Sequence, residues 1–395
     1  MDKSTNNKGK TKKQKLNKNN KTVKNNNKYS IILPNLTPIN DLKLSETLAK
    51  GLQNDVKYSS YSPSINKMLV SLKSIPRNEI VDCNNDLAFK LKEPLQIGII
   101  DTKFKRKCYD YESPEAKAIS LRNLTANKHI NTSKIIPPIQ SQSNCWFNTM
   151  FVIFFVSDKG RKFFHYFRQL MIEGKQHNGE IIPKKLRDAF ALLNFGIDAC
   201  LTGDKYAYEL NTNSIIKQIY KSIPVKYKGN KIYNVDEAGN PLYYYLSILN
   251  YLDNSPLLLI YLKNCNRKWK EQLKEEIKNI THLPHIIVIE VHKSAAAEFN
   301  NKPLTFSFNN ASYKLDSSAI IDKSGQHFCA HITCEGKEYG YDGMSFHRLV
   351  EMKWKNKINK DFNWQFEGTK DYDGTPLEWN YTNGYQLLMY YRSSI

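Results

Sequence analysis

The sequence lacks any long run of apolar residues. The longest obvious one, from Met150 to Val156, has seven residues and is ended by Ser157 and Asp158, whereas a helix that crosses a bilayer needs roughly 20. The first residues, Met-Asp-Lys-Ser-Thr-Asn-Asn, also lack the apolar stretch of a secretory signal. These two absences predict a protein with no membrane contact.

Cysteine is scarce and irregularly placed. The chain has seven cysteines, an odd number, spread widely along it, which excludes a small disulfide-stapled scaffold. They favour reduced thiols in an intracellular, reducing compartment: the cytoplasm, or a virion if the chain is viral. The bias towards Lys, Asn and Ile is typical of an AT-rich genome, such as those of some large DNA viruses. Paired C-x-x-C motifs are missing, so we expect no zinc finger, and no cofactor.

Acidic residues are nearly absent from the first 28 residues. These hold ten lysines and one aspartate, against a net charge of +20 for the whole chain. With so few apolar side chains, the segment cannot offset the entropy of ordering it, so residues 1–28 are expected to be disordered. Two interpretations stay open: a solvated tail without a role, or non-specific attraction to nucleic acid or another polyanion.

The rest of the chain is rich enough in apolar residues to fold, at 41% hydrophobic and 12% aromatic overall. Residues 29–134 give short, mixed signals and no chemical motif, and form an N-terminal region of unknown role. After Pro137-Pro138, residues 135–395 show helical patterns first and strand patterns later, which predicts an α+β fold. Helices are expected at 45–52, 115–124, 145–156, 162–172, 183–193, 242–252 and 268–280, with a break at Gly160. Strands are expected at 29–33, 95–100, 286–291, 313–321, 327–333, 339–342 and 385–391.

Cys145 is the first candidate catalytic residue. It follows a polar loop, Gln140 to Asn144, and opens the most apolar expected helix. A helix N-terminus stabilises a thiolate and an oxyanion beside it. The side-chain amides of Gln140 and Gln142 are close enough in sequence to reach the same space. The alternative is an inert cysteine at the start of a core helix.

A histidine and an acid are expected on one hairpin near the C-terminus. His327 begins a strand after a tight turn at Gly325, and a second turn at Gly336 returns the chain to Asp342. The hairpin would place Asp342 beside His327, where a carboxylate holds the imidazole tautomer that accepts a thiol proton. A satisfied core histidine is the plainer alternative.

A zinc site is a third interpretation of this strand. It would use His327, Cys329, His331 and Cys334 as ligands. Residues that alternate along one strand rarely converge on a tetrahedron, so packing roles are the stronger expectation for Cys329, His331 and Cys334.

With the cysteine first, then the histidine and then the acid along the chain, the motifs resemble those of the ubiquitin-specific proteases. These are a deubiquitinase family with a papain-like catalytic fold. Gln140 to Thr149, QSQSNCWFNT, is similar to the family's cysteine box, and Gln326-His327-Phe328 followed by Tyr341-Asp342 is similar to its histidine box. Three further segments, 283–291, 313–325 and 383–392, are similar to its flanking strands. The resemblance covers about residues 135–395.

The resemblance implies a papain-like α+β fold and a thiol-dependent hydrolase that cleaves ubiquitin or a ubiquitin-like protein. Cys145 would be the nucleophile, His327 the base, Asp342 its orienter and Gln140 an oxyanion donor. Residues 239–246, Gly-Asn-Pro-Leu-Tyr-Tyr-Tyr-Leu, depart from the family's Gln-Asp-Ala-x-Glu-Phe-Leu, which leaves the substrate-binding residues unknown. The alternative is a catalytically inactive protein that binds a ubiquitin-like partner or builds a virion.

Overall fold

The structure, a computed structural model, describes residues 86–100, 106–126, 130–228, 239–253, 259–278 and 283–394, together with residues 83, 234, 235 and 237. The expected tail at 1–28 and the elements expected at 29–33 and 45–52 lie outside these residues. None of the described helices is both long and apolar enough to cross a bilayer.

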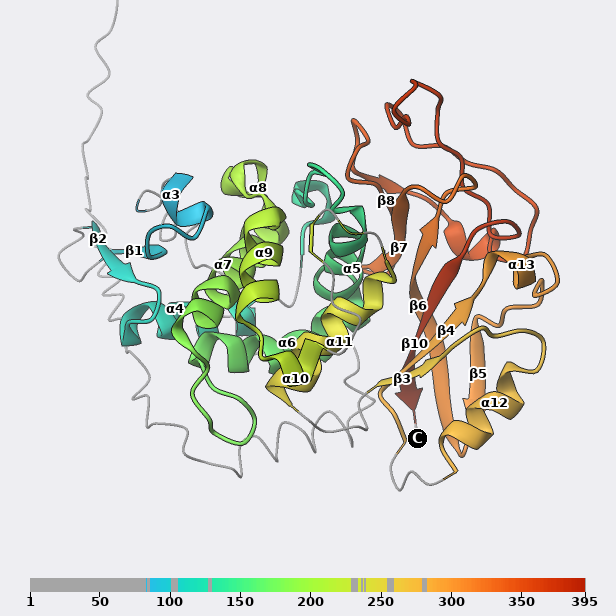
Figure 1. The fold of residues 1–395 in the computed structure, drawn as a ribbon, viewed down its shortest axis with the longest axis horizontal. Coiled ribbons are helices and arrows are strands. Elements are labelled where there is room, and N and C mark those ends of the chain that lie inside the picture. The colour runs from blue at the N-terminus through green and yellow to red at the C-terminus, as the bar shows by residue number, and fades with distance from the viewer. Residues whose placement is uncertain are drawn as a thin grey trace, which may run out of the picture. The chain divides into compact units, whose positions relative to one another are not determined.

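Helices dominate the first half of the described chain (Figure 1). One hairpin, β1 (Gln96–Ile100) with β2 (Arg106–Asp110), lies among them. The helices are α3 (Asp86–Phe89), α4 (Pro114–Ala126), α5 (Cys145–Phe155), α6 (Asp158–Glu173), α7 (Lys184–Thr202), α8 (Tyr206–Glu209), α9 (Thr212–Ser222), α10 (Val225–Lys228) and α11 (Pro241–Leu252).

The second half is built on a sheet of strand order β3-β4-β10-β6-β7-β8-β9, with β5 paired to β6. Only β3 and β4 are parallel within it. The strands are β3 (Leu259–Leu262), β4 (Ile286–Val291), β5 (Thr305–Phe308), β6 (Ala311–Ile321), β7 (Phe328–Cys334), β8 (Lys337–Tyr341), β9 (Leu349–Glu351) and β10 (Gln386–Ser394); α12 (Trp269–Glu276) and α13 (Lys293–Ala296) lie between them. The α+β prediction is confirmed.

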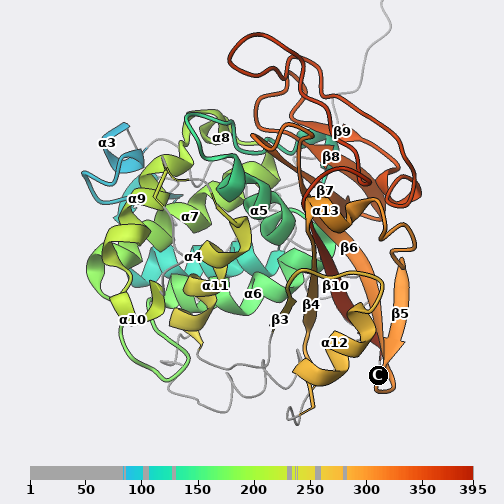
Figure 2. The ribbon, with the colours of Figure 1, turned by 45° about the vertical axis from the view of Figure 1, so that its right-hand side comes forward.

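Each face of the sheet has its own hydrophobic core. On β7, alternate residues such as Phe328 and Ala330 join the cluster that contains α5, while Cys329 faces a second cluster with Trp269 of α12. The two ribbon views show α5, α6 and α11 on one side of the sheet and α12 on the other (Figures 1 and 2). After Cys145, every residue of α5 is buried. The expectation of a buried helix that starts at Cys145 and packs on the sheet is therefore confirmed.

The expected helix break at Gly160 is wrong. Helix α5 ends at Phe155, and Gly160 lies inside the first turn of α6. Ser157 makes the break instead, because its hydroxyl donates to Ile153 O at 2.7 Å and accepts the Gly160 N–H at 3.0 Å. A Cβ on residue 160 would lie 2.1 Å from Ile153 O. Glycine therefore serves the close approach of two helices.

The expectation of seven reduced thiols is wrong for two of them. Cys83 forms a disulfide with Cys108, an exposed residue on strand β2, and their Cα atoms are 5.7 Å apart. The spacing of the cysteines along the sequence could not predict this pair, because the disulfide joins residues that are distant in sequence and adjacent in space.

The described part of the N-terminal region packs on the helices that follow it. Phe89, Ile97 and Tyr111 belong to the same hydrophobic cluster as α5 and α6, and α4 contacts α6. The domain boundary between residues 134 and 135 stays a prediction.

Candidate active site

The hairpin of β7 and β8 brings His327 and Asp342 together. Glu335 and Gly336 turn the chain with positive φ angles of 49° and 74°, and Ala330 then pairs with Tyr341. As a result His327 Nε2 lies 2.6 Å from Asp342 Oδ1. His327 is 3% exposed and Asp342 is fully buried. The hairpin prediction is confirmed, and the role of the pair in catalysis stays a prediction.

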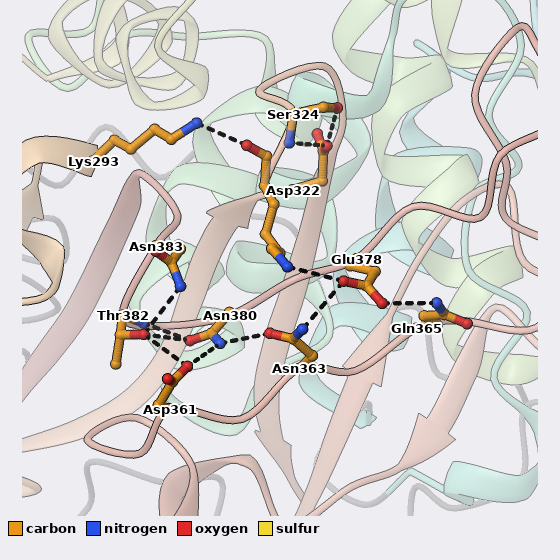
Figure 3. Close-up of polar contacts among 11 residues, drawn as sticks. Lys293, Asp322, Ser324, Asp361, Asn363, Gln365, Glu378, Asn380, Thr382 and Asn383 are labelled. Atoms are coloured by element: carbon orange, nitrogen blue, oxygen red, sulfur yellow. Dashed lines mark hydrogen bonds and ion pairs between the residues drawn. The ribbon is translucent and has the colours of Figure 1, made fainter.

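The turn that carries His327 is organised by Asp322. Its carboxylate accepts the backbone N–H groups of Ser324, Gln326 and His327 at 2.6–2.7 Å, and the Ser324 hydroxyl. Figure 3 shows Ser324 folded onto Asp322, while Lys293 reaches the same turn from α13; its Nζ donates to Lys323 O at 2.8 Å. Sequence reasoning did not single out Asp322, although the segment Asp322-Lys-Ser-Gly325 holds the Asp, Ser and Gly that favour such a turn.

Asp342 is fixed by further donors. The Thr369 hydroxyl donates to Asp342 Oδ2, and the Met344 N–H donates to Oδ1 at 3.1 Å. Thr369 is 1% exposed. The carboxylate therefore bonds the imidazole with one oxygen and is held by Thr369 through the other.

The surroundings of His327 favour its protonated form. Burial disfavours an imidazolium, but hydrogen bonds to Asp342 and Cys145 and the charges of both groups outweigh it. Together they raise the pKa of His327 to about 10. Among the groups that raise it are the thiol and the carboxyl that the sequence placed around this histidine.

Cys145 is half-buried at the first position of α5, and a buried amide network holds the loop before it. Asn144 Nδ2 donates to Thr212 Oγ1 at 3.0 Å and to Asn213 Oδ1 at 2.8 Å. The Asn144 Oδ1 atom accepts the Ser141 N–H at 3.1 Å. Both partners of its amide group lie on α9, which the sequence reading did not predict.

Gln140 is held next to the Asp342 loop. Its N–H donates to Gly343 O at 2.9 Å, and its Oε1 is buried without a partner among the described residues. Gln140, Gln142 and Cys145 line one cavity of about 570 Å³. The structure therefore brings all four predicted site residues, Gln140, Cys145, His327 and Asp342, to one region.

The zinc interpretation does not fit the strand. Cys329 and Cys334 lie in the two different hydrophobic clusters, on opposite faces of the sheet. His331 instead bonds the Tyr381 hydroxyl through Nδ1 at 2.7 Å and stacks on Trp354, and burial lowers its pKa to about 3. Within the described part of the chain, no group of three or more His, Cys, Asp or Glu side chains could hold a metal ion.

Comparison with known proteins does not assign a family. No protein-family model and no curated protein matches the chain. Among solved structures, an essential yeast splicing factor is similar over 75% of this chain and 83% of its own, with 8% identity and a TM-score of 0.38. A yeast SAGA DUBm with an Sgf73 mutant is similar over 66% and 69%, with 10% identity and a TM-score of 0.30. TM-scores this low carry no conclusion about function.

Proposed function

We propose that this protein is a thiol-dependent hydrolase with a papain-like catalytic fold, which cleaves isopeptide or peptide bonds of ubiquitin or a ubiquitin-like protein. The observation that carries the proposal is the buried His327–Asp342 pair, 2.6 Å apart, with Cys145 close enough to contribute to the raised pKa of His327. That arrangement is what a cysteine nucleophile needs. The substrate class rests on the sequence resemblance over residues 135–395.

The reaction would proceed through a thioester. With Nε2 of His327 bonded to Asp342, Nδ1 holds the thiol proton, and the Cys145 sulfur attacks the substrate carbonyl carbon. When the C–N bond breaks, His327 gives that proton to the departing amine. Water, deprotonated by His327, then attacks the thioester and releases the carboxylate and the thiol. Asp342 stays ionised and orients the imidazole throughout.

The oxyanion of each tetrahedral intermediate would be held by Gln140 and by backbone N–H groups at the start of α5. Gln140 lines the cavity beside Cys145, and its backbone N–H is bonded to Gly343 O. Loss of one such donor costs about 10²–10³ in rate.

Hydrolysis of ubiquitin and ubiquitin-like proteins that carry a C-terminal fluorogenic amide tests this proposal. The native chain should release the fluorophore, Cys145→Ala should not, and Gln140→Ala should slow release by about 10²–10³. Glu275→Gln, at an exposed position on α12, is the control and should behave as the native chain. No release from any of these substrates, by a folded native chain with a reduced Cys145, would overturn the proposal.

A catalytically inactive binding protein is the second candidate. The observation that favours it lies at the start of α11, where residues 239–246 depart from the family's motif. There the polar side-chain atoms of Asn240 already have hydrogen-bond partners within the chain. Its Oδ1 accepts the Leu242 N–H at 2.9 Å, and its Nδ2 donates to the hydroxyls of Tyr261 and Tyr385. Tight binding of a ubiquitin-like protein, unchanged in Cys145→Ala and without hydrolysis, would favour this candidate.

We further propose that residues 1–28 bind polyanions non-specifically and that the protein works inside the cell, or in a virion if the chain is viral. Ten lysines in this segment would give salt-dependent retention on nucleic acid. Deletion of residues 1–28 should weaken that retention and leave the melting temperature and any hydrolysis unchanged. Retention that survives the deletion would contradict this role.

A further inference from the structure

The loop that leads into Cys145 contains a residue in an unfavourable backbone conformation. Gln142 has a φ of 63°, which lies in the left-handed region that residues with a Cβ adopt only at a cost. Such conformations persist where the surrounding structure holds them, and they cluster at functional sites. Gln142 also lines the cavity beside Cys145. The contacts that hold Gln142 are therefore relevant to the chemistry of that cavity.

Both ends of the cysteine loop, residues 140–144, are fixed to other parts of the chain. At one end, the Gln140 N–H donates to Gly343 O at 2.9 Å. At the other end, Asn144 is fully buried and its side chain is bonded to α9. Only three residues connect these two anchors, and a left-handed residue among them lets the chain turn sharply enough to do so.

Asn213, the second residue of α9, holds the middle of the cysteine loop. Its side chain is mostly buried, at 7% exposed. The Asn213 Nδ2 atom donates to Ser141 O at 3.0 Å, to the Ser141 hydroxyl at 3.2 Å and to Gln142 Oε1 at 3.0 Å. Its Oδ1 atom accepts Asn144 Nδ2 at 2.8 Å. Any other conformation of the loop would break several of these bonds and leave amide groups of Asn144 and Asn213 buried without partners, which is costly.

The conformation of Gln142 decides where Gln140 lies relative to the Cys145 sulfur. Gln140 comes two residues before Gln142, and Cys145 comes three residues after it. A change of φ at residue 142 would swing one of these segments against the other and move the Gln140 amide away from the cavity. Oxyanion donors act over a narrow range of distances, and a displacement of about 1 Å is enough to slow a reaction strongly.

We propose that Asn213 and Gln142 are positioning residues for the oxyanion site. Asn213 holds residue 142 in its left-handed conformation, and that conformation places the Gln140 amide beside Cys145. This inference rests on the proposed function for the role of Gln140. It requires that the two residues affect any acyl transfer to Cys145, whatever the natural substrate is.

Two reactions of the same thiol in the full-length chain test the proposal. p-Nitrophenyl acetate transfers its acetyl group to the Cys145 sulfur through a tetrahedral oxyanion and releases p-nitrophenolate. Iodoacetamide alkylates the same sulfur by displacement of iodide, and no oxyanion forms. Both rates are measured at Cys145 by peptide mapping. A role in the oxyanion site predicts loss of the acetylation rate alone, whereas general damage to the fold or to the thiol would slow both reactions.

Asn213→Ala should lower the acetylation rate about 10–100-fold and leave the alkylation rate within about twofold, since alkylation forms no oxyanion. The matched control is Gln218→Ala, further along α9, where the side chain bonds Lys185 O and the Ser222 hydroxyl instead of the cysteine loop. This control should behave as the native chain in both reactions.

Substitutions at residue 142 separate the backbone conformation from the side-chain bond. Gln142→Val and Gln142→Gly both lose the bond to Asn213, but valine disfavours a positive φ and glycine adopts it without steric cost. Acetylation should therefore be much slower in Gln142→Val than in Gln142→Gly. When Gln142→Gly is added to Asn213→Ala, it should recover most of the acetylation rate that Asn213→Ala loses.

Three results would overturn the proposal. They are equal losses of acetylation and alkylation in Asn213→Ala, equal acetylation rates in Gln142→Val and Gln142→Gly, and a double variant that is no faster than Asn213→Ala. If Asn213→Ala does not fold, the comparison of valine with glycine at residue 142 still decides.

The outcomes also separate this inference from the proposed function. Acetylation that depends on Asn213, without hydrolysis of any ubiquitin-like substrate by the native chain, would leave the positioning role standing and remove the proposed function. Hydrolysis that is as fast in Asn213→Ala as in the native chain would do the reverse. A Cys145 that reacts with iodoacetamide and not with p-nitrophenyl acetate would contradict both.

Discussion

The His327–Asp342 pair makes stability depend on pH in a defined window. His327 has a pKa of about 10 in the folded protein and an ordinary value near 6.5 when unfolded. Between these values the imidazole of His327 is protonated in the folded state and not in the unfolded state. The stabilisation is therefore fully present below about pH 6.5 and is lost as pH rises towards 10. At about 1.4 kcal/mol per pH unit, the loss is at most about 5 kcal/mol.

A second buried group, Lys302, changes the free energy of unfolding with pH in the opposite direction. Its contribution has to be separated from that of His327. Lys302 is 2% exposed, and burial lowers its pKa to about 8. Its unfolded form therefore binds more protons between about pH 8 and 10.4, so this lysine makes stability rise with pH there. The informative quantity is the difference between the native chain and His327→Gln, in which Lys302 is unchanged.

Urea unfolding at several pH values between 6 and 10 measures this difference. The free energy of unfolding of the native chain should fall, relative to that of His327→Gln, by several kcal/mol across the window. Asp342→Asn removes the main charged partner and should flatten most of the difference, while Glu275→Gln should not. If the free energy of unfolding of the native chain and of His327→Gln changed in parallel with pH, the claim that His327 and Asp342 form a buried, charged pair would be refuted.

Three further predictions follow from the packing around the site. Iodoacetamide at limiting concentration should modify Cys145 first, because burial raises the pKa of the other four free thiols; even labelling of all five would contradict this, and peptide mapping decides. Thr369→Val should lower kcat about 10–100-fold with KM unchanged, since Asp342 loses a donor, and Thr369→Ser should restore it; a change confined to KM would count against a positioning role. Gly160→Ala should lower the free energy of unfolding by about 1–3 kcal/mol in urea, because the new Cβ overlaps the preceding helix; an unchanged midpoint would argue against that close contact.

The parts of the site that follow from local patterns were predictable from the sequence. A polar loop before an apolar run indicated that α5 begins at Cys145, and two turns with glycine placed Asp342 opposite His327. Both features depend on residues within about 20 positions of one another. Turn chemistry and hydrophobic periodicity act over that range.

The supporting contacts were not predictable, because they join distant segments through single side chains. Thr369 reaches Asp342 from 27 residues away, and Asn144 is held from α9, 68 and 69 residues away. Nothing in the local pattern of α9 indicates that it serves the cysteine loop. The prediction of a helix break at Gly160 was wrong for the same reason, because a glycine in a helical pattern indicates a break unless the contact with the neighbouring helix is known.

The central claim is that Cys145, with His327 and Asp342, performs thiol chemistry on the C-terminal tail of ubiquitin or a ubiquitin-like protein. The most direct test is incubation of the full chain with a panel of these proteins, each carrying a C-terminal electrophile, followed by mass mapping of the adduct. The account predicts one adduct, on Cys145, that is absent in Cys145→Ala and much slower to form in His327→Gln. An adduct on another cysteine, or none with any member of the panel while iodoacetamide still modifies Cys145, would contradict it.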